Sequence, residues 1–225
     1  MGAGKLFLSG GGGKNDSKLL DEMFAKCLDK KKILYIPIAM LQTEHSFAEC
    51  HIWIKSVFKD FGISDITMWT DLSGKKYEDL SGFEAIYIGG GNTFKLMDDL
   101  KKSKFDKFLK IFFVNGGIIY GGSAGAIILG DDIGTSSDNN DVGLKDLSGM
   151  KLLKGFSIWC HYKAEHDELL FDYVRNKKIP TIAIPEKSGI VFDEGKITIV
   201  GFESVFLFAD NKKISFSPGS IVEQK

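Results

Sequence analysis

The stretch Gly117-Ile-Ile-Tyr-Gly-Gly-Ser-Ala-Gly-Ala-Ile-Ile-Leu129 joins an apolar strand to an apolar helix through a turn of small residues. Its centre is a Gly-x-Ser-x-Gly pattern around Ser123. Such a turn holds the serine on a strained backbone, and its glycines let the turn approach its neighbours without Cβ clashes. The helix start offers the Ala124 N–H to a developing oxyanion. The stretch therefore predicts a nucleophilic Ser123; the alternatives are a phosphate-binding turn and a tight structural bend.

Apolar segments of strand length alternate with helical patterns through the first 130 residues. The expected strands cover residues 5–9, 33–38, 65–69, 85–88 and 117–120. The expected helices cover residues 17–28, 47–61, 93–100, 105–114 and 124–129. Because each strand is apolar throughout, the pattern predicts a parallel sheet covered by helices on both faces.

The C-terminal part of the chain has a different pattern. Short strand segments separated by turn residues lie at 181–184, 189–192, 196–200, 205–208 and 213–216. They predict antiparallel hairpins that flank or extend the sheet. No linker, repeat or low-complexity segment is visible. We therefore predict an α/β fold with a mainly parallel sheet and C-terminal antiparallel hairpins, in one domain over residues 1–225.

The composition argues against several classes of partner. Lys and Arg (29) balance Asp and Glu (30), leaving a net charge of −1, so no nucleic acid partner is expected. Apolar runs such as Ile111–Val114 are too short to cross a bilayer, and Met1–Leu8 shows no signal-peptide pattern. Cys27, Cys50 and Cys160 are scattered, which indicates reduced thiols. We therefore expect a cytoplasmic protein without a membrane partner.

A serine nucleophile needs a base, and the chain has four histidines: His45, His51, His161 and His166. His161 follows an apolar run that ends at Cys160, so it is expected at a strand end. His45 and His51 precede the serine and are interpreted as surface or packing residues, and His166 begins the next helix. Strand neighbours point to opposite faces, which places Cys160 in the core. We predict that His161 is the base; no ligand grouping favours a metal site.

Two carboxylates are candidates for orienting the histidine. Asp138 lies in the loop 131–149, which is rich in Asp, Ser, Asn and Gly, and Glu186 follows a short apolar strand and Pro185. A rigid strand end holds a carboxylate better than a mobile loop, so we predict Glu186. Closure of the loop over substrate would instead bring in Asp138.

Two glycine-rich segments are also expected at strand ends. Gly89-Gly-Gly-Asn92 ends one strand, and the carboxyl ends of parallel strands share one rim. The N–H groups of Gly90 and Gly91 are therefore candidates to complete an oxyanion hole with Ala124, while Asn92 is a candidate both to bind substrate and to cap the following helix. Gly10-Gly-Gly-Gly-Lys14 fits neither a P-loop nor a dinucleotide fingerprint, and we interpret it as a rim loop.

Together, Tyr87-Ile-Gly-Gly-Gly-Asn-Thr-Phe94 and Gly121-Gly-Ser-Ala-Gly-Ala126 resemble the family of peptidase E (aspartyl dipeptidase) and cyanophycinase. The resemblance covers most of the chain. It implies a three-layer sandwich like the class I glutamine amidotransferases, with serine in place of cysteine at the turn.

The resemblance also implies a role for each candidate residue. Ser123 matches the nucleophile and His161 the base, and Gly90 or Gly91 with Ala124 matches the oxyanion hole. Precedents within the family exist for both candidate acids, Asp138 and Glu186.

One segment departs from the family pattern. Peptidase E carries an extended segment after the histidine, with an arginine that recognises an N-terminal aspartate. Here that insertion is missing, and Glu168 falls near the place of the arginine. Lys163 and Arg175 are the candidate replacements. The sequence therefore predicts little preference for N-terminal aspartate.

These features together predict a peptidase that acts on short peptides through an acyl-enzyme, without a cofactor. Its expected partners are a short peptide substrate and, as one option, a second copy of the chain in a homodimer. Two alternatives stay open. An α/β esterase shares the serine turn, and a non-catalytic amidotransferase-like binding module shares the fold.

Overall fold

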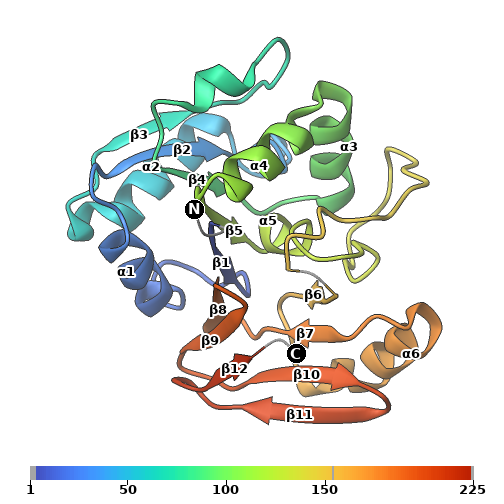
Figure 1. Cartoon of the computed structure of the whole chain (residues 1–225). Coiled ribbons are helices and arrows are strands. Elements are labelled where there is room, and N and C mark those ends of the chain that lie inside the picture. Colours follow the sequence, from blue (N-terminus) through green and yellow to red (C-terminus); the bar gives the residue numbers. More distant parts are fainter. Residues whose placement is uncertain (1–3, 154, 224–225) are drawn as a thin grey trace.

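The structure is a computed structural model that describes residues 4–153 and 155–223, so the first three residues of the predicted N-terminal segment lie outside it. Its centre is an eight-stranded sheet in the order β12-β9-β8-β1-β5-β4-β2-β3. A second sheet of four strands, in the order β11-β10-β7-β6, lies below the parallel strands of the main sheet in Figure 1. The mixed α/β class and the mostly parallel main sheet are confirmed.

The parallel part of the main sheet is formed by the five N-terminal strands. They are β1 (Lys5–Ser9), β2 (Lys32–Ile36), β3 (Asp65–Met68), β4 (Ala85–Ile88) and β5 (Ile118–Gly122). Neighbouring strands pair in parallel from β1 through β5, β4 and β2 to β3. β5 runs two residues beyond the predicted strand, which brings its end directly to Ser123.

Helices cover both faces of this sheet (Figure 1). They are α1 (Lys18–Lys26), α2 (Phe47–Phe58), α3 (Thr93–Ser103), α4 (Phe105–Val114) and α5 (Ala124–Ile127). On β1, Leu6 and Leu8 belong to the core beneath α3, α4 and α5, whereas Phe7 belongs to the core beneath α1 and α2. The alternation explains why an all-apolar strand is needed: both of its faces are buried.

Short 3-10 turns lie between the longer elements: one directly follows α2, one lies between β3 and β4, and one precedes the helix that begins at Asp167. They are η1 (Lys59–Phe61), η2 (Tyr77–Leu80) and η3 (Ala164–His166). The predicted helix end at Gly62 is confirmed: η1 follows α2 directly and Gly62 adopts a left-handed φ of 72°. At its start, α2 has a capping box in which Ser46 and Glu49 satisfy each other's backbone N–H groups.

The C-terminal part divides between the two sheets. Its elements are β6 (Ser157–Trp159), α6 (Asp167–Lys177), β7 (Thr181–Ala183), β8 (Ser188–Asp193), β9 (Lys196–Gly201), β10 (Val205–Ala209), β11 (Lys212–Phe216) and β12 (Ile221–Glu223). The β8–β9 hairpin extends the main sheet antiparallel to β1, and the β10–β11 hairpin joins β7 in the second sheet. The predicted hairpins are confirmed; β12 is an additional strand.

This arrangement brings separate strand ends together. β1, β4 and β5 are neighbours in the main sheet, so their carboxyl ends lie on one rim. The end of β6 reaches the same rim, since the His161 N–H donates to the Gly10 carbonyl oxygen at 2.9 Å. Among the described residues, no helix has the length and apolar character needed to span a membrane.

Candidate active site

Ser123 occupies a sharp turn between β5 and α5. Its φ of 48° and ψ of −109° lie outside the ordinary regions for a residue with a Cβ. Such a conformation costs on the order of 1–3 kcal/mol and persists where the surroundings enforce it. Here one constraint is the Ser123 N–H, which donates to the Ser9 carbonyl oxygen of β1 at 3.3 Å.

The two glycines of the Gly-x-Ser-x-Gly pattern are required by close packing. A Cβ on Gly121 would lie 2.4 Å from the Gly125 carbonyl oxygen. A Cβ on Gly125 would lie 2.3 Å from the carbonyl oxygen of Ile88 in β4. Larger residues would push α5 away from the sheet and displace the serine, which agrees with the packing role predicted for both glycines.

His161 lies two residues beyond the end of β6 and faces the serine. Its Nε2 is 2.8 Å from Ser123 Oγ, and its Nδ1 is 2.9 Å from Glu186 Oε1. His161 itself has a φ of 53°, so two facing residues both occupy uncommon backbone conformations. The structure thus joins the predicted serine, histidine and glutamate in one hydrogen-bonded chain.

The glycine loop after β1 makes room for this chain. Gly11 has a φ of 103°, and a Cβ there would lie 2.4 Å from Cε1 of the His161 ring. A Cβ on Gly10 would lie 2.0 Å from the Pro185 carbonyl oxygen, and one on Gly12 would lie 2.5 Å from that of Glu186. The segment is therefore a rim loop, as predicted, and its glycines let the loop pass against the histidine and the turn that bears Glu186.

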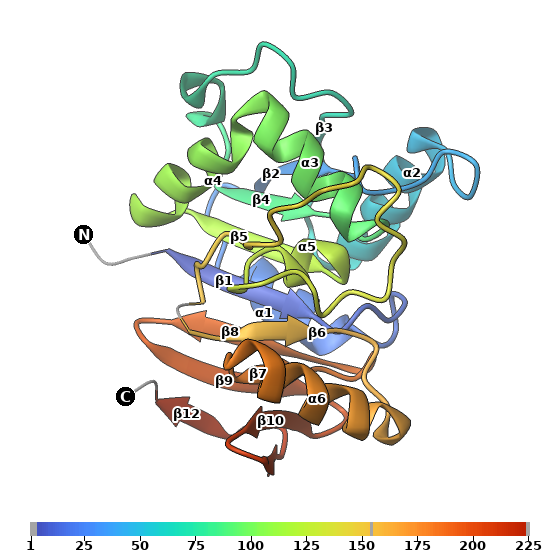
Figure 2. The same cartoon turned by 90° about the vertical axis from the view of Figure 1, so that its right-hand side faces the viewer.

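Asp138 lies elsewhere. Its Oδ2 accepts hydrogen bonds from the Thr93 N–H at 2.7 Å and from the Ser136 hydroxyl at 2.8 Å. This places the carboxylate at the first turn of α3, where the helix dipole stabilises a negative charge. Figure 2 shows the loop 131–149 running beside α3. From the sequence, Asp138 is expected in a mobile loop. In the structure these two hydrogen bonds hold its carboxylate at the helix terminus.

The segment after β4 lies against the serine turn. An added Cβ on Gly90 would be 3.3 Å from Ser123 Cβ. Within the described residues, the N–H groups of Gly90, Gly91 and Ala124 have no backbone acceptor. Asn92 differs, because its Oδ1 accepts from the Lys95 N–H and its Nδ2 donates to the Asn139 carbonyl, both at 2.9 Å. Asn92 therefore caps the start of α3, as one of its two expected roles predicts.

Cys160 and the other histidines do not take part in this hydrogen-bonded chain. Cys160 is 6% exposed, and burial raises the pKa of its thiol far above the ordinary value, so it stays protonated in the core. His166 Nδ1 lies 3.4 Å from Nε1 of Trp159, away from the serine. His51 Nε2 lies 3.2 Å from the Ile66 carbonyl oxygen. Of the other histidines, only His45 faces the site.

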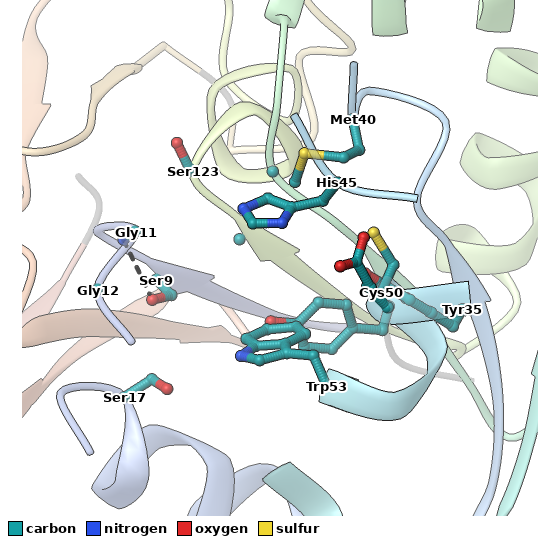
Figure 3. A pocket seen from close by; sticks show the side chains of 14 residues that line it. Ser9, Gly11, Gly12, Ser17, Tyr35, Met40, His45, Cys50, Trp53 and Ser123 are labelled. Atoms are coloured by element: carbon teal, nitrogen blue, oxygen red, sulfur yellow. Dashed lines mark hydrogen bonds between the residues drawn. The ribbon is translucent and has the colours of Figure 1, made fainter. Parts of the chain in front are cut away.

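A pocket of about 350 Å³ opens beside Ser123. We call it the Trp53 pocket (Figure 3). The residues that line it come from strand ends, from the segments that follow them and from α2: Ser9, Gly11, Gly12, Ser17, Tyr35, Met40, His45, Glu49, Cys50, Trp53, Tyr87, Gly90, Gly122 and Ser123. Sequence reasoning missed its α2 side. The available signal was that the segment after β2 leaves the same rim as the predicted loops, so α2 begins next to the serine.

Polar groups beneath the pocket are satisfied within the core. Asp21 is 1% exposed and accepts hydrogen bonds from the Tyr120 hydroxyl and the Ser17 hydroxyl, both at 2.7 Å. Burial raises the pKa of Asp21 to about 6. The Tyr120 ring stacks on Tyr87 at a centroid distance of 4.4 Å, and Tyr87 forms part of the pocket floor.

Metal ligation has no candidate group here. In the part of the chain that the structure describes, no cluster of three or more His, Cys, Asp or Glu side chains has an arrangement that could hold a metal ion. The donors at the site are instead one hydroxyl, one imidazole and one carboxylate in a row.

Comparison with known proteins identifies the family. Residues 6–200 match the model described as Peptidase family S51. A peptidase E from Nostoc sp. is 28% identical over 189 residues, covering 79% of this chain and 76% of the relative. A Drosophila melanogaster protein named "Probable alpha-aspartyl dipeptidase" is 24% identical over 200 residues, covering 84% and 80%.

A solved structure shows the same fold. The crystal structure of a peptidase from an acI-B1 actinobacterium superposes with a TM-score of 0.74 at 17% identity, covering 99% of this chain and 98% of that one. The resemblance read from the two glycine motifs is thereby confirmed. The chain belongs to peptidase family S51, together with peptidase E.

Proposed function

We propose that the protein is a serine peptidase that cleaves short peptides through an acyl-enzyme on Ser123. The observation that carries the proposal is the chain of hydrogen bonds from Ser123 through His161 to Glu186, with distances of 2.8 and 2.9 Å. A serine is a weak nucleophile unless an adjacent base accepts its proton, and the base works best when a third group orients it. The family membership of the chain supports peptides as the substrate class.

Each atom of the row has one task in the proposed reaction. The Glu186 carboxylate accepts a hydrogen bond from the protonated Nδ1 of His161, which leaves Nε2 unprotonated and facing the serine hydroxyl. Ser123 Oγ attacks the peptide carbonyl carbon as Nε2 takes the hydroxyl proton. His161 then protonates the leaving amine as the C–N bond breaks. In the second half, His161 Nε2 takes a proton from water as the water oxygen attacks the acyl carbon. His161 then returns that proton to Ser123 Oγ as the Oγ–acyl bond breaks, which releases the acid product and restores the serine hydroxyl.

The oxyanion of the tetrahedral intermediate needs donors on the opposite side from His161. We assign this role to the Ala124 N–H at the start of α5 and to the N–H of Gly90 or Gly91. Support comes from the close approach of Gly90 to Ser123 and from the free state of these N–H groups within the described residues. Fixed backbone donors stabilise developing negative charge without reorganisation.

Specificity for N-terminal aspartate, as in the aspartyl dipeptidase name of one relative, is not part of the proposal. None of the described residues that line the Trp53 pocket is lysine or arginine. Of the candidate replacements, Arg175 pairs with Asp172 on α6, and Lys163 is exposed and outside the lining. A carboxylate bound without a paired cation is disfavoured.

The test is hydrolysis of a dipeptide and tripeptide library, with the products identified by mass. Wild type should cleave a subset of the peptides, and Ser123→Ala should lose at least about a thousandfold in kcat with an unchanged melting temperature. Ser64→Ala, at an exposed serine before β3, is the matched control and should behave as wild type.

Two results would argue for the alternatives. Turnover of acyl esters but of no peptide would indicate an esterase. Activity above about a tenth of wild type in Ser123→Ala would remove Ser123 from the mechanism.

A further inference from the structure

The Trp53 pocket lies on one side of the proposed reaction centre. Its lining includes Ser123 and Gly90, whose N–H is one of the proposed oxyanion donors. The described lining residues do not include His161. In Figure 3 the pocket spreads from Ser123 toward the α2 side, where Trp53 and His45 project into it.

This placement determines which part of a substrate would enter, given the function proposed above. In the tetrahedral intermediate the attacked carbon carries Ser123 Oγ, the oxyanion, the leaving nitrogen and the Cα of the acyl-side residue. The oxyanion points to the backbone donors, and the leaving nitrogen must face His161 Nε2 to receive its proton. The substituent left to face the Trp53 pocket is the residue whose carbonyl is attacked.

The chemistry of the walls is mostly apolar and aromatic. Trp53 packs edge-on to Tyr87 at a centroid distance of 6.3 Å, and Tyr35 does so at 5.6 Å. Met40 and Cys50 complete this surface. Flat rings together with a flexible thioether suit an apolar or aromatic guest, because burying a large apolar side chain away from water is favourable.

The charged groups at the rim argue against an acidic guest. Glu49 lines the pocket, and hydrogen bonds from the Ser46 N–H and hydroxyl hold the pKa of its carboxyl below the ordinary value. It therefore carries a negative charge at neutral pH. Since no lysine or arginine is among the described lining residues, an aspartate side chain would meet repulsion without a partner.

We propose that the Trp53 pocket selects a large apolar or aromatic residue on the acyl side of the cleaved bond. A dipeptide series Xaa-Leu tests this directly, because its one peptide bond places Xaa on the acyl side. With Xaa as Phe, Leu, Ala, Asp or Lys, we expect kcat/KM for Phe-Leu to exceed that for Ala-Leu by about tenfold to a hundredfold. Asp-Leu should fall below Ala-Leu.

Variants on α2 connect the preference to the pocket. Trp53→Ala should lower the ratio of kcat/KM for Phe-Leu to that for Ala-Leu by about tenfold. Ile52→Ala is the matched control, since Ile52 is the adjacent residue on the same helix and is 70% exposed; its ratio should equal that of wild type. Met40→Ala, a second change in the pocket wall, should also lower this ratio. Circular dichroism checks that each variant is folded.

The outcomes separate this proposal from the function on which it rests. Labelling of Ser123 by a fluorophosphonate with peptide turnover, but with Asp-Leu or Lys-Leu preferred over Phe-Leu, would overturn the pocket assignment alone. An unchanged ratio in both folded pocket variants would do the same. Absence of both labelling and peptide turnover in wild type would overturn the proposed function and this inference with it.

Discussion

Glu186 and Asp138 are both carboxylates that follow the serine in sequence, yet the fold places them in different settings. Glu186 lies at the end of β7, where its Oε1 is 2.9 Å from His161 Nδ1. Asp138 lies in the loop 131–149, where it accepts from the Thr93 N–H at the start of α3. One carboxylate faces the imidazole and the other faces a helix terminus.

The difference shows that a loop carboxylate can be held in place by hydrogen bonds that direct it away from the histidine. The loop is attached to α3 at several points, including Asn92 to Asn139 and Lys101 to Asp146. A backbone and a side-chain donor engage Oδ2 of Asp138, whereas the carboxylate hydrogen-bonded to His161 among the described residues is that of Glu186. The predictions below test this division of roles, beginning with the largest effect.

His161, the proposed base, should rank with the nucleophile among the residues most sensitive to substitution. We expect His161→Ala to lower kcat by about ten thousandfold, because both proton transfers pass through its Nε2. His166→Ala should change kcat by no more than a few-fold, since His166 contacts Trp159 instead of the serine. Steady-state peptide hydrolysis measures both, and the reverse ranking would show that the base is assigned to the wrong histidine.

Amide substitutions compare the two carboxylates directly. An amide keeps the shape of the side chain but favours the wrong imidazole tautomer, so Glu186→Gln should lower kcat by about a thousandfold. Asp138→Asn should change kcat by less than about threefold. A large kcat loss in Asp138→Asn beside a nearly silent Glu186→Gln would transfer the triad role to the loop.

The glycine loop should matter for activity at one position more than at another. Gly11→Ala places a Cβ against the His161 ring at a positive φ, and we expect a loss of about a hundredfold in kcat from the displaced imidazole. Gly13→Ala is the matched control, because the nearest atom to its Cβ, Asp16 Oδ2, is at an ordinary 3.6 Å. Equal losses in the two variants would mean that the loop acts through general stability.

The smallest effect concerns the structural carboxylate. Asp138→Asn weakens a charge-assisted hydrogen bond at the first turn of α3, which should cost about 0.5–1 kcal/mol of unfolding free energy. For a chain of this size that corresponds to a melting temperature lower by about 2 °C. Asp141→Asn, at an exposed position of the same loop, serves as the control in thermal denaturation. An unchanged melting temperature in Asp138→Asn would remove its helix-capping role.

Much of the fold was predictable from local pattern. Strands buried on both faces must be apolar throughout, so a run such as Ile86–Ile88 of β4 can be recognised as a central strand from the sequence. The division of the C-terminal strands between two sheets was not predictable. β8 and β10 have similar apolar patterns, and their different partners are decided by long-range packing, for which a single sequence carries no local signal.

The candidate residues at strand ends could be predicted from the sequence, whereas the pocket residue on the face of α2 could not. Ser123, His161 and Glu186 each follow an apolar strand. The carboxyl ends of such strands are expected to lie at one edge of the fold, which brings the residues that follow them together. Trp53 lies in the helix expected over residues 47–61, and its spacing there is that of a core residue. Its 37% exposure beside the serine arises from the position of α2 on the sheet, which periodicity alone does not give.

Labelling with a fluorophosphonate, followed by peptide mapping, tests the central claim most directly. We predict one adduct, on Ser123, forming at least about a hundredfold more slowly in Glu186→Gln and at the wild-type rate in Asp138→Asn. An adduct on another residue, no adduct on Ser123, or slow labelling in Asp138→Asn alone would contradict the row of Ser123, His161 and Glu186.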